Sequence, residues 1–164
     1  MTDPMVDPWP TSFSRLPALI VDIDETIATE FDRPIMIACG ILQAVHRQRL
    51  EVHYVTARPV STRPATERFL SEHRLPGWKN LHFCPTWMSS TQHKREVHAR
   101  LAKEYWVLAS IGDSDEEAKA SEATGIPFHR VIIGEPESAW LEVERILAHL
   151  ALLRGEDEDE FTIP

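Results

Sequence analysis

An apolar segment that ends in two acidic residues constrains this chain more than any other feature of its sequence. Residues 18–21 are aliphatic, and Asp22 and Asp24 follow on either side of Ile23. A continuous apolar run of this length is typical of a parallel β-strand that is buried on both faces. Burial of an ionised carboxylate is costly unless a cation or hydrogen bonds compensate it. The pattern therefore predicts a cation site, a phosphate site or both at the strand end; the alternative is an ordinary turn, where Asp and Thr are also common.

Apolar strand patterns alternate with helical patterns along the rest of the chain. Strands are predicted at about 17–23, 52–56, 81–84, 106–111 and 128–133, and helices at about 34–48, 62–75, 92–104, 115–124 and 136–153. This alternation predicts crossover connections and a parallel sheet, and right-handed crossovers place helices on both of its faces. We therefore expect an α/β fold: a doubly wound, Rossmann-like parallel sheet of about five strands.

Length and charge limit the domain organisation and the partners. A chain of 164 residues predicts one domain, here 16–154, after an extended lead-in at 1–15 and before an acidic, mobile tail at 155–164. The 26 acidic residues outnumber the 17 basic ones, for a formal net charge of -9. This balance argues against extended electrostatic contact with a nucleic-acid duplex. A small phosphorylated compound or a nucleic-acid end stays open as the substrate.

Several residue types give no sign of another chemistry. Cys39 and Cys84 lack metal-type spacing, so we interpret them as buried thiols of a reducing compartment. The eight histidines are scattered, and we interpret them as ordinary surface or half-buried residues. The sequence lacks a secretory signal pattern and any apolar run of membrane-spanning length. We expect a cytoplasmic protein without a membrane partner.

Polar side chains suited to phosphate chemistry follow the predicted strands at their carboxyl ends. Beyond Asp22 and Asp24, they are Thr56 and Arg58 after the second strand, Lys94 in the helix after the third, and Asp113 and Glu117 after the fourth. Ligands of an open parallel sheet bind beyond the carboxyl ends of its strands. We therefore expect these distant residues to form one site.

The chemistry of these side chains is complementary. Asp22 and Asp113 offer the hard anionic oxygens that Mg²⁺ prefers. Lys94 and the cation would together offset the charge of a phosphoryl group, to which the Thr56 hydroxyl can donate. Such an arrangement lets Asp22 attack phosphorus as a nucleophile, while Asp24 protonates the leaving oxygen and later takes a proton from water.

This constellation resembles the haloacid dehalogenase superfamily of phosphatases. The Asp-Ile-Asp-Glu-Thr segment at 22–26 matches the first motif of that family, Asp-x-Asp-x-Thr/Val, and Thr56 and Lys94 match the second and third. The Gly-Asp-Ser segment at 112–114, together with Glu117, matches the fourth. The resemblance covers roughly residues 17–133.

The resemblance implies a role for each matched residue. Asp22 would be the nucleophile and Asp24 the general acid/base. Mg²⁺ would be held by Asp22, the backbone carbonyl of Asp24 and Asp113, and Glu117 would lie in the outer shell. The fourth motif leaves open which of three adjacent acids is its second carboxylate: Asp115, Glu116 or Glu117. Thr56 and Lys94 would contact the phosphoryl group. Arg58 is outside these motifs, but its place at the same edge makes it a candidate for substrate binding; the alternative is a surface salt bridge.

The spacing between motifs leaves no room for the cap domain that many family members carry. A capless member has an open site, which in the family accompanies large substrates or a partner subunit that covers the site, so a homodimer is one expected arrangement. Residues 55–58 and their spacing to Lys94 also resemble the phosphatase half of polynucleotide kinase-phosphatases, although the kinase half is absent. We expect a Mg²⁺-dependent phosphomonoester hydrolase; the alternatives are a polynucleotide 3′-phosphatase and a non-catalytic phosphate-binding protein.

Overall fold

Five parallel strands form the sheet at the centre of the molecule. The computed structural model describes residues 15–45 and 48–155. The strands are β1 (Pro17–Val21), β4 (Glu51–Val55), β5 (Leu81–His82), β6 (Trp106–Gly112) and β7 (Phe128–Arg130). Their order is β5-β4-β1-β6-β7, and each neighbouring pair is parallel. The strand that precedes the two acids therefore lies in the middle of the sheet.

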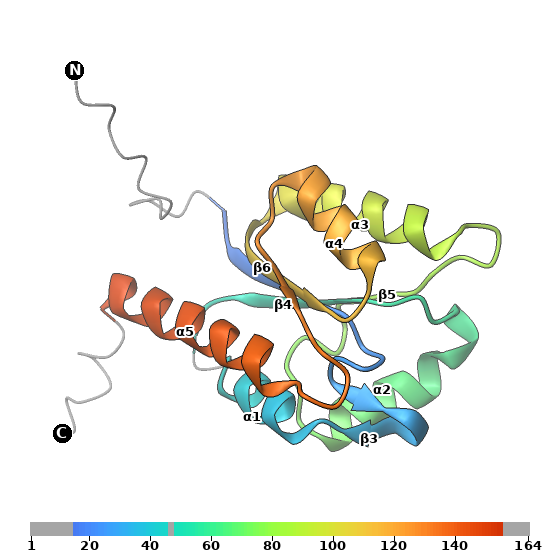
Figure 1. Cartoon of the computed structure of the whole chain (residues 1–164), viewed down its shortest axis with the longest axis horizontal. Helices are drawn as coiled ribbons and strands as arrows, with labels where there is room; N and C mark the ends of the chain where they lie inside the picture. The colour runs from blue at the N-terminus through green and yellow to red at the C-terminus, as the bar shows by residue number, and fades with distance from the viewer. Residues whose placement is uncertain (1–14, 46–47, 156–164) are drawn as a thin grey trace.

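Helices cover both faces of this sheet (Figure 1). They are α1 (Met36–Val45), α2 (Arg63–Glu72), α3 (Ser90–Glu104), α4 (Asp115–Thr124) and α5 (Glu137–Arg154). Figure 1 shows α3 and α4 side by side on one face, and α1, α2 and α5 on the other. The predicted doubly wound α/β fold is confirmed.

The alternation of side chains along β1 divides the core into two parts. All five residues of β1 are buried, as the apolar run predicts. Leu19 and Val21 belong to the larger cluster, which includes Trp140 of α5. Ile20 points to the opposite face and packs with the second cluster, which includes Val97 of α3. Burial on both faces fixes the strand register, and with it the position of the acids that follow.

Several predicted boundaries are wrong by a few residues, for local reasons. β1 ends at Val21 rather than at Ile23, because the Ile23 carbonyl accepts the amides of residues 26–28 and starts a turn. Pro34, expected in the first turn of a helix, instead pairs with Ala28, and α1 begins at Met36. At the start of α2, the Thr62 side chain does not cap the helix but donates to the Pro59 carbonyl at 2.8 Å.

The segment after the first acids folds into a small flap. β2 (Ala28–Thr29) and β3 (Arg33–Pro34) pair as an antiparallel hairpin around the short 3-10 helix η1 (Glu30–Asp32). Phe31 and Asp32 both have left-handed backbones, with φ of 60° and 52°. The Phe31 side chain is 91% exposed. The segment between the first acids and α1 is therefore a paired hairpin.

The predicted lead-in and acidic tail lie outside the described residues, apart from Arg15 and Gly155. Within the described ranges, no helix combines the length and the apolarity needed to cross a membrane. Cys39 and Cys84 are both buried free thiols, as predicted.

Candidate active site

The first motif leaves β1 as a tight, buried turn. The Asp22 amide donates to the Ile111 carbonyl at 2.9 Å, which extends the contact between β1 and β6. The Asp22 side chain is 5% exposed, and the Thr26 hydroxyl donates to its Oδ2 at 3.3 Å. Glu25 takes a left-handed conformation with φ of 60°, so the chain reverses directly after the acids. The turn thus fixes the Asp22 carboxylate at the carboxyl end of the central strand.

The side chain of Lys94, in α3, extends to the Asp22 carboxylate. Its side chain is 4% exposed, and its Nζ lies 3.5 Å from Oδ1 of Asp22. Nζ also forms an ion pair with Glu117 and lies 3.9 Å from Glu116. One buried ammonium therefore faces three carboxylates, which leaves the site with excess negative charge.

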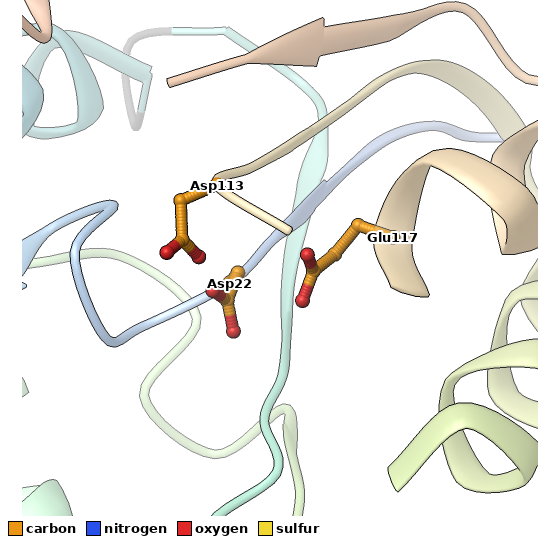
Figure 2. A group of neighbouring side chains, drawn as sticks. All are labelled: Asp22, Asp113 and Glu117. Carbon is orange, nitrogen blue, oxygen red and sulfur yellow. The ribbon is translucent and has the colours of Figure 1, made fainter. Parts of the chain in front are cut away.

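A further carboxylate, that of Asp113 in the loop after β6, joins this cluster. Ligand oxygens of Asp22, Asp113 and Glu117 all lie within 4.8 Å of one another, and Figure 2 shows the three carboxylates converging. Glu117 also forms a capping box with Ser114, the N-cap residue of α4, since its Oε2 accepts the Ser114 amide at 2.9 Å. A Cβ on Gly112 would lie 2.7 Å from the Glu117 Cγ, so only glycine leaves this side chain in place.

The donor set of this cluster fits a divalent cation. Burial raises the pKa of Asp22 to about 7; the Lys94 charge opposes this shift, and the neighbouring Asp113 adds to it. A carboxylate in this position is stabilised by another nearby positive charge. Few carboxylates with space for water and a substrate phosphate are what Mg²⁺ requires. Asp22 and Asp113 are suited to bind it directly, whereas Glu117 is already engaged by Lys94 and Ser114.

Thr56 and Arg58 line the site from the end of β4. Thr56 is fully buried, and its Oγ1 accepts the Arg58 amide at 3.1 Å. The Arg58 guanidinium donates to Asp24 and to Asp32, each at 2.7 Å. The Arg58 side chain, expected to bind substrate, therefore has carboxylate partners of its own in this structure.

An open cavity of about 590 Å³ adjoins Asp24 on the side of the flap. Its walls combine the flap with the start of α2, and they are formed by Asp24, Glu25, Thr29, Glu30, Phe31, Asp32, Arg58, Thr62 and Ala65. Asp24, two residues after the buried Asp22, thus contributes to the wall of this cavity.

Three histidines, His53, His93 and His98, are buried, which corrects for them the expectation of surface or half-buried residues. The other histidines that the structure describes are half-buried or exposed, as predicted. His98 Nδ1 lies 2.7 Å from the Lys94 carbonyl and Nε2 lies 3.1 Å from the Ser110 hydroxyl. Because a carbonyl only accepts, Nδ1 donates to it; a neutral ring then accepts from the Ser110 hydroxyl through Nε2. Burial lowers the pKa of His98 to about 4.

The structure thus gathers Asp22, Lys94, Asp113 and Glu117 into one cluster, with Thr56 beside it and the Asp24 carboxylate turned toward Arg58. Sequence reasoning missed two contributors. The Trp140 indole of α5 donates to the Thr26 carbonyl at 3.1 Å. Asp32 of the flap contacts Arg58. Neither residue belongs to a sequence motif. Their contacts join segments that are far apart in the chain, so the sequence gives no signal for them.

Fold and site together define a class: doubly wound α/β proteins with an acidic cluster at the carboxyl edge of the sheet. No protein-family model matches the chain, and no curated protein matches it. Among solved structures, the Pnkp1/Rnl/Hen1 complex matches with a TM-score of 0.65 and 17% identity, over 80% of this chain and 51% of that one. A class C acid phosphatase from Bacillus anthracis with tungstate bound matches with a TM-score of 0.52 and 14% identity, over 71% and 66%.

A second structure, of the Pnkp1/Rnl/Hen1 RNA repair complex, matches with a TM-score of 0.63 and 18% identity, over 74% of this chain and 45% of that one. The chain thus spans about half the length of the Pnkp1/Rnl/Hen1 chains that it matches. At these identities the likeness establishes the shared fold.

Proposed function

We propose that this protein is a Mg²⁺-dependent phosphomonoester hydrolase in which Asp22 becomes transiently phosphorylated. The observation that carries the proposal is the position of the Asp22 carboxylate. It is buried at the end of the central strand, 3.5 Å from the Lys94 ammonium and clustered with Asp113 and Glu117. A buried nucleophile, a cation and oxygen ligands at one point are the requirements of phosphoryl transfer through an enzyme carboxylate.

Different residues of the site would bind the metal ion and the phosphoryl group. Asp22, the Asp24 carbonyl and Asp113 would hold Mg²⁺, which when bound neutralises charge on the phosphoryl oxygens. Lys94 offsets the same charge, and the Thr56 hydroxyl donates to a phosphoryl oxygen.

In the first half of the reaction, an Asp22 oxygen forms a bond to phosphorus while the bond from phosphorus to the leaving oxygen breaks. Asp24 gives its proton to that oxygen, so the leaving group departs as an alcohol. In the second half, Asp24 takes a proton from water, whose oxygen attacks phosphorus and releases inorganic phosphate. Asp22 is thereby regenerated as a carboxylate.

The test is phosphate release from a panel of small phosphomonoesters, with Mg²⁺ and with a chelator. Turnover is expected only with Mg²⁺, and it is expected to disappear in Asp22→Asn. Glu122→Gln, the same change of carboxylate to amide at an exposed position of α4, is the matched control. Equal turnover in Asp22→Asn and in the wild type would overturn the proposal.

A second candidate, a polynucleotide 3′-phosphatase, is supported by the Thr-Ala-Arg segment at 56–58 and by the fold match to an RNA repair complex. Inclusion of 3′-phosphorylated oligonucleotides in the panel tests it directly. If those substrates are turned over faster than mononucleotides and sugar phosphates, the second candidate is favoured. Binding of Mg²⁺ and phosphate without turnover of any substrate would favour a non-catalytic role.

The cytoplasmic location and the homodimer stay predictions.

A further inference from the structure

We propose that Asp32 of the flap is a positioning residue, which acts through Arg58 to orient the carboxylate of Asp24. This inference rests on the proposed function, in which Asp24 is the general acid/base. It assigns Arg58 a role different from phosphate binding, and it gives the flap a part in the reaction.

Arg58 contacts the Asp24 carboxylate through two of its nitrogen atoms. Nε lies 3.2 and 3.1 Å from the two carboxylate oxygens of Asp24, and NH2 lies 2.7 Å from Oδ1. A guanidinium that meets one carboxylate through Nε and a terminal nitrogen holds it in a fixed plane. Asp24 is therefore held in one orientation, although its side chain is 57% exposed.

The remaining nitrogen contacts show that Arg58 has little capacity for another anion. NH2 also donates to Oδ1 of Asp32 at 2.7 Å, and NH1 donates to the Thr66 hydroxyl at 3.1 Å. Because a guanidinium has five N–H donors, these contacts leave a single N–H, on NH1. A phosphate held bidentately needs two adjacent donors. The Arg58 side chain is also only 14% exposed, so we assign it to Asp24 rather than to substrate.

The flap is built in a way that delivers Asp32 to this position. Its two strands are two residues long, and the turn between them contains consecutive left-handed residues, Phe31 and Asp32. Such conformations are unfavourable for residues other than glycine and persist where surrounding contacts enforce them. The ion pair between Asp32 and Arg58 is the contact that ties this turn to the site.

Two elements therefore hold Arg58, one from each side. Thr66 is fully buried within α2 and fixes NH1. Asp32 fixes NH2 from the flap. Without the Asp32 carboxylate, the guanidinium loses one of these two restraints, and Asp24 loses its fixed orientation toward the leaving oxygen. General acid catalysis depends on that geometry, because the proton must move along a short hydrogen bond.

The experiment compares two substrates of nearly equal size that differ in their need for a proton. The 4-nitrophenyl group of an aryl phosphate departs without one, whereas 4-nitrobenzyl phosphate releases a strongly basic alkoxide unless an acid protonates it. The readout is kcat/KM, because it reports the steps up to departure of the leaving group and leaves out hydrolysis of the phosphorylated Asp22. Inhibition by inorganic phosphate measures phosphate binding separately.

In Asp32→Asn, kcat/KM for the nitrobenzyl ester is expected to fall by about tenfold or more, and that for the nitrophenyl ester by less than about threefold. The inhibition constant of phosphate is expected to stay unchanged. Glu67→Gln, which breaks the exposed pair between Glu67 and Arg63 on α2, is the matched control and is expected to behave as wild type.

Equal losses on both substrates, no loss on either, or weaker inhibition by phosphate in Asp32→Asn would overturn the role of Asp32. Absence of turnover by the wild type on both esters and on the wider panel would instead overturn the proposed function, and this inference with it. Thermal unfolding of Asp32→Asn at the wild-type temperature ensures that a loss reflects the site and not the fold.

Discussion

The indole nitrogen of Trp140 lies 3.1 Å from the carbonyl oxygen of Thr26, a residue 114 positions earlier in the chain. This hydrogen bond joins α5 to the turn that positions Asp22. Trp140 is fully buried, so the bond also satisfies a polar group that has no access to water. A helix on one face of the sheet thus supports the turn that holds Asp22 at the edge of the sheet.

Replacement of Trp140 with Phe is expected to destabilise the protein. The change removes the indole donor and leaves the Thr26 carbonyl unpaired in the core, which costs about 1–3 kcal/mol before the loss of packing is added. Urea denaturation measures the free energy of unfolding. Trp78→Phe, at a side chain that is 42% exposed, is the control and is expected to change it little. Equal stability of the two variants would contradict this account.

Replacement of Lys94 with Met is expected to abolish turnover and lower stability. The variant leaves Asp22, Glu116 and Glu117 without their shared ammonium, and removal of one partner from a buried ion pair costs about 3–5 kcal/mol. Thermal unfolding with and without Mg²⁺ is the measurement. Mg²⁺ is expected to raise the melting temperature of the variant, because it replaces part of the missing charge. Lys103→Met on the same helix should leave both properties near wild type.

Alanine at the two glycines Gly112 and Gly40 is expected to act in opposite directions. At Gly112 the new Cβ would lie 2.7 Å from the Glu117 Cγ, so Glu117 must leave its place beside Lys94. We expect lower stability and a loss of Mg²⁺ affinity, measured by calorimetric titration. At Gly40, within α1, no atom lies within 4 Å of the new Cβ, and the better helix propensity of alanine adds up to about 1 kcal/mol. A stable, Mg²⁺-binding Gly112→Ala variant would refute the steric argument.

Stability is expected to fall in acid because buried histidines must stay neutral. Burial lowers the pKa of His98 to about 4, whereas an unfolded histidine titrates near 6.5. Between these values the unfolded state binds the extra proton, so the contribution of His98 is complete above pH 6.5 and is lost as pH falls toward 4. Within this range, one such histidine changes the free energy of unfolding by ~1.4 kcal/mol per pH unit.

The buried Asp22 carboxyl contributes with the opposite sign, since its pKa is raised in the folded state. The measurement is the difference in unfolding free energy between wild type and His98→Gln, followed from pH 8 to pH 5. The contribution of Asp22 is present in both proteins and therefore cancels in this difference. We expect the difference to shrink as pH falls. The exposed His149→Gln is the control, and a difference for His98 that is independent of pH would contradict a neutral buried ring.

The arrangement of strands and helices follows from the sequence because it depends on local patterns. Continuous apolar runs such as 18–21 mark strands buried on both faces, and helical spacing between them requires parallel crossovers. Convergence of Asp22, Lys94 and Asp113 also follows, because each lies after a strand and parallel strands end at one edge. The boundaries at Ile23 and Pro34 were less predictable, since hydrogen bonds in the turn and the flap decided them.

The fold class, the central strand and the acidic residues at its end are predictable from the chain, since they depend on hydrophobic periodicity and on topology. The partners of those residues emerge only when the chain is folded. The contacts in question form between side chains and backbone groups of different elements. They join Arg58 to Asp24 and Asp32, His98 to Lys94, and Trp140 to Thr26. Such contacts are set by the packing of segments far apart in the chain, and a local pattern carries no signal for them.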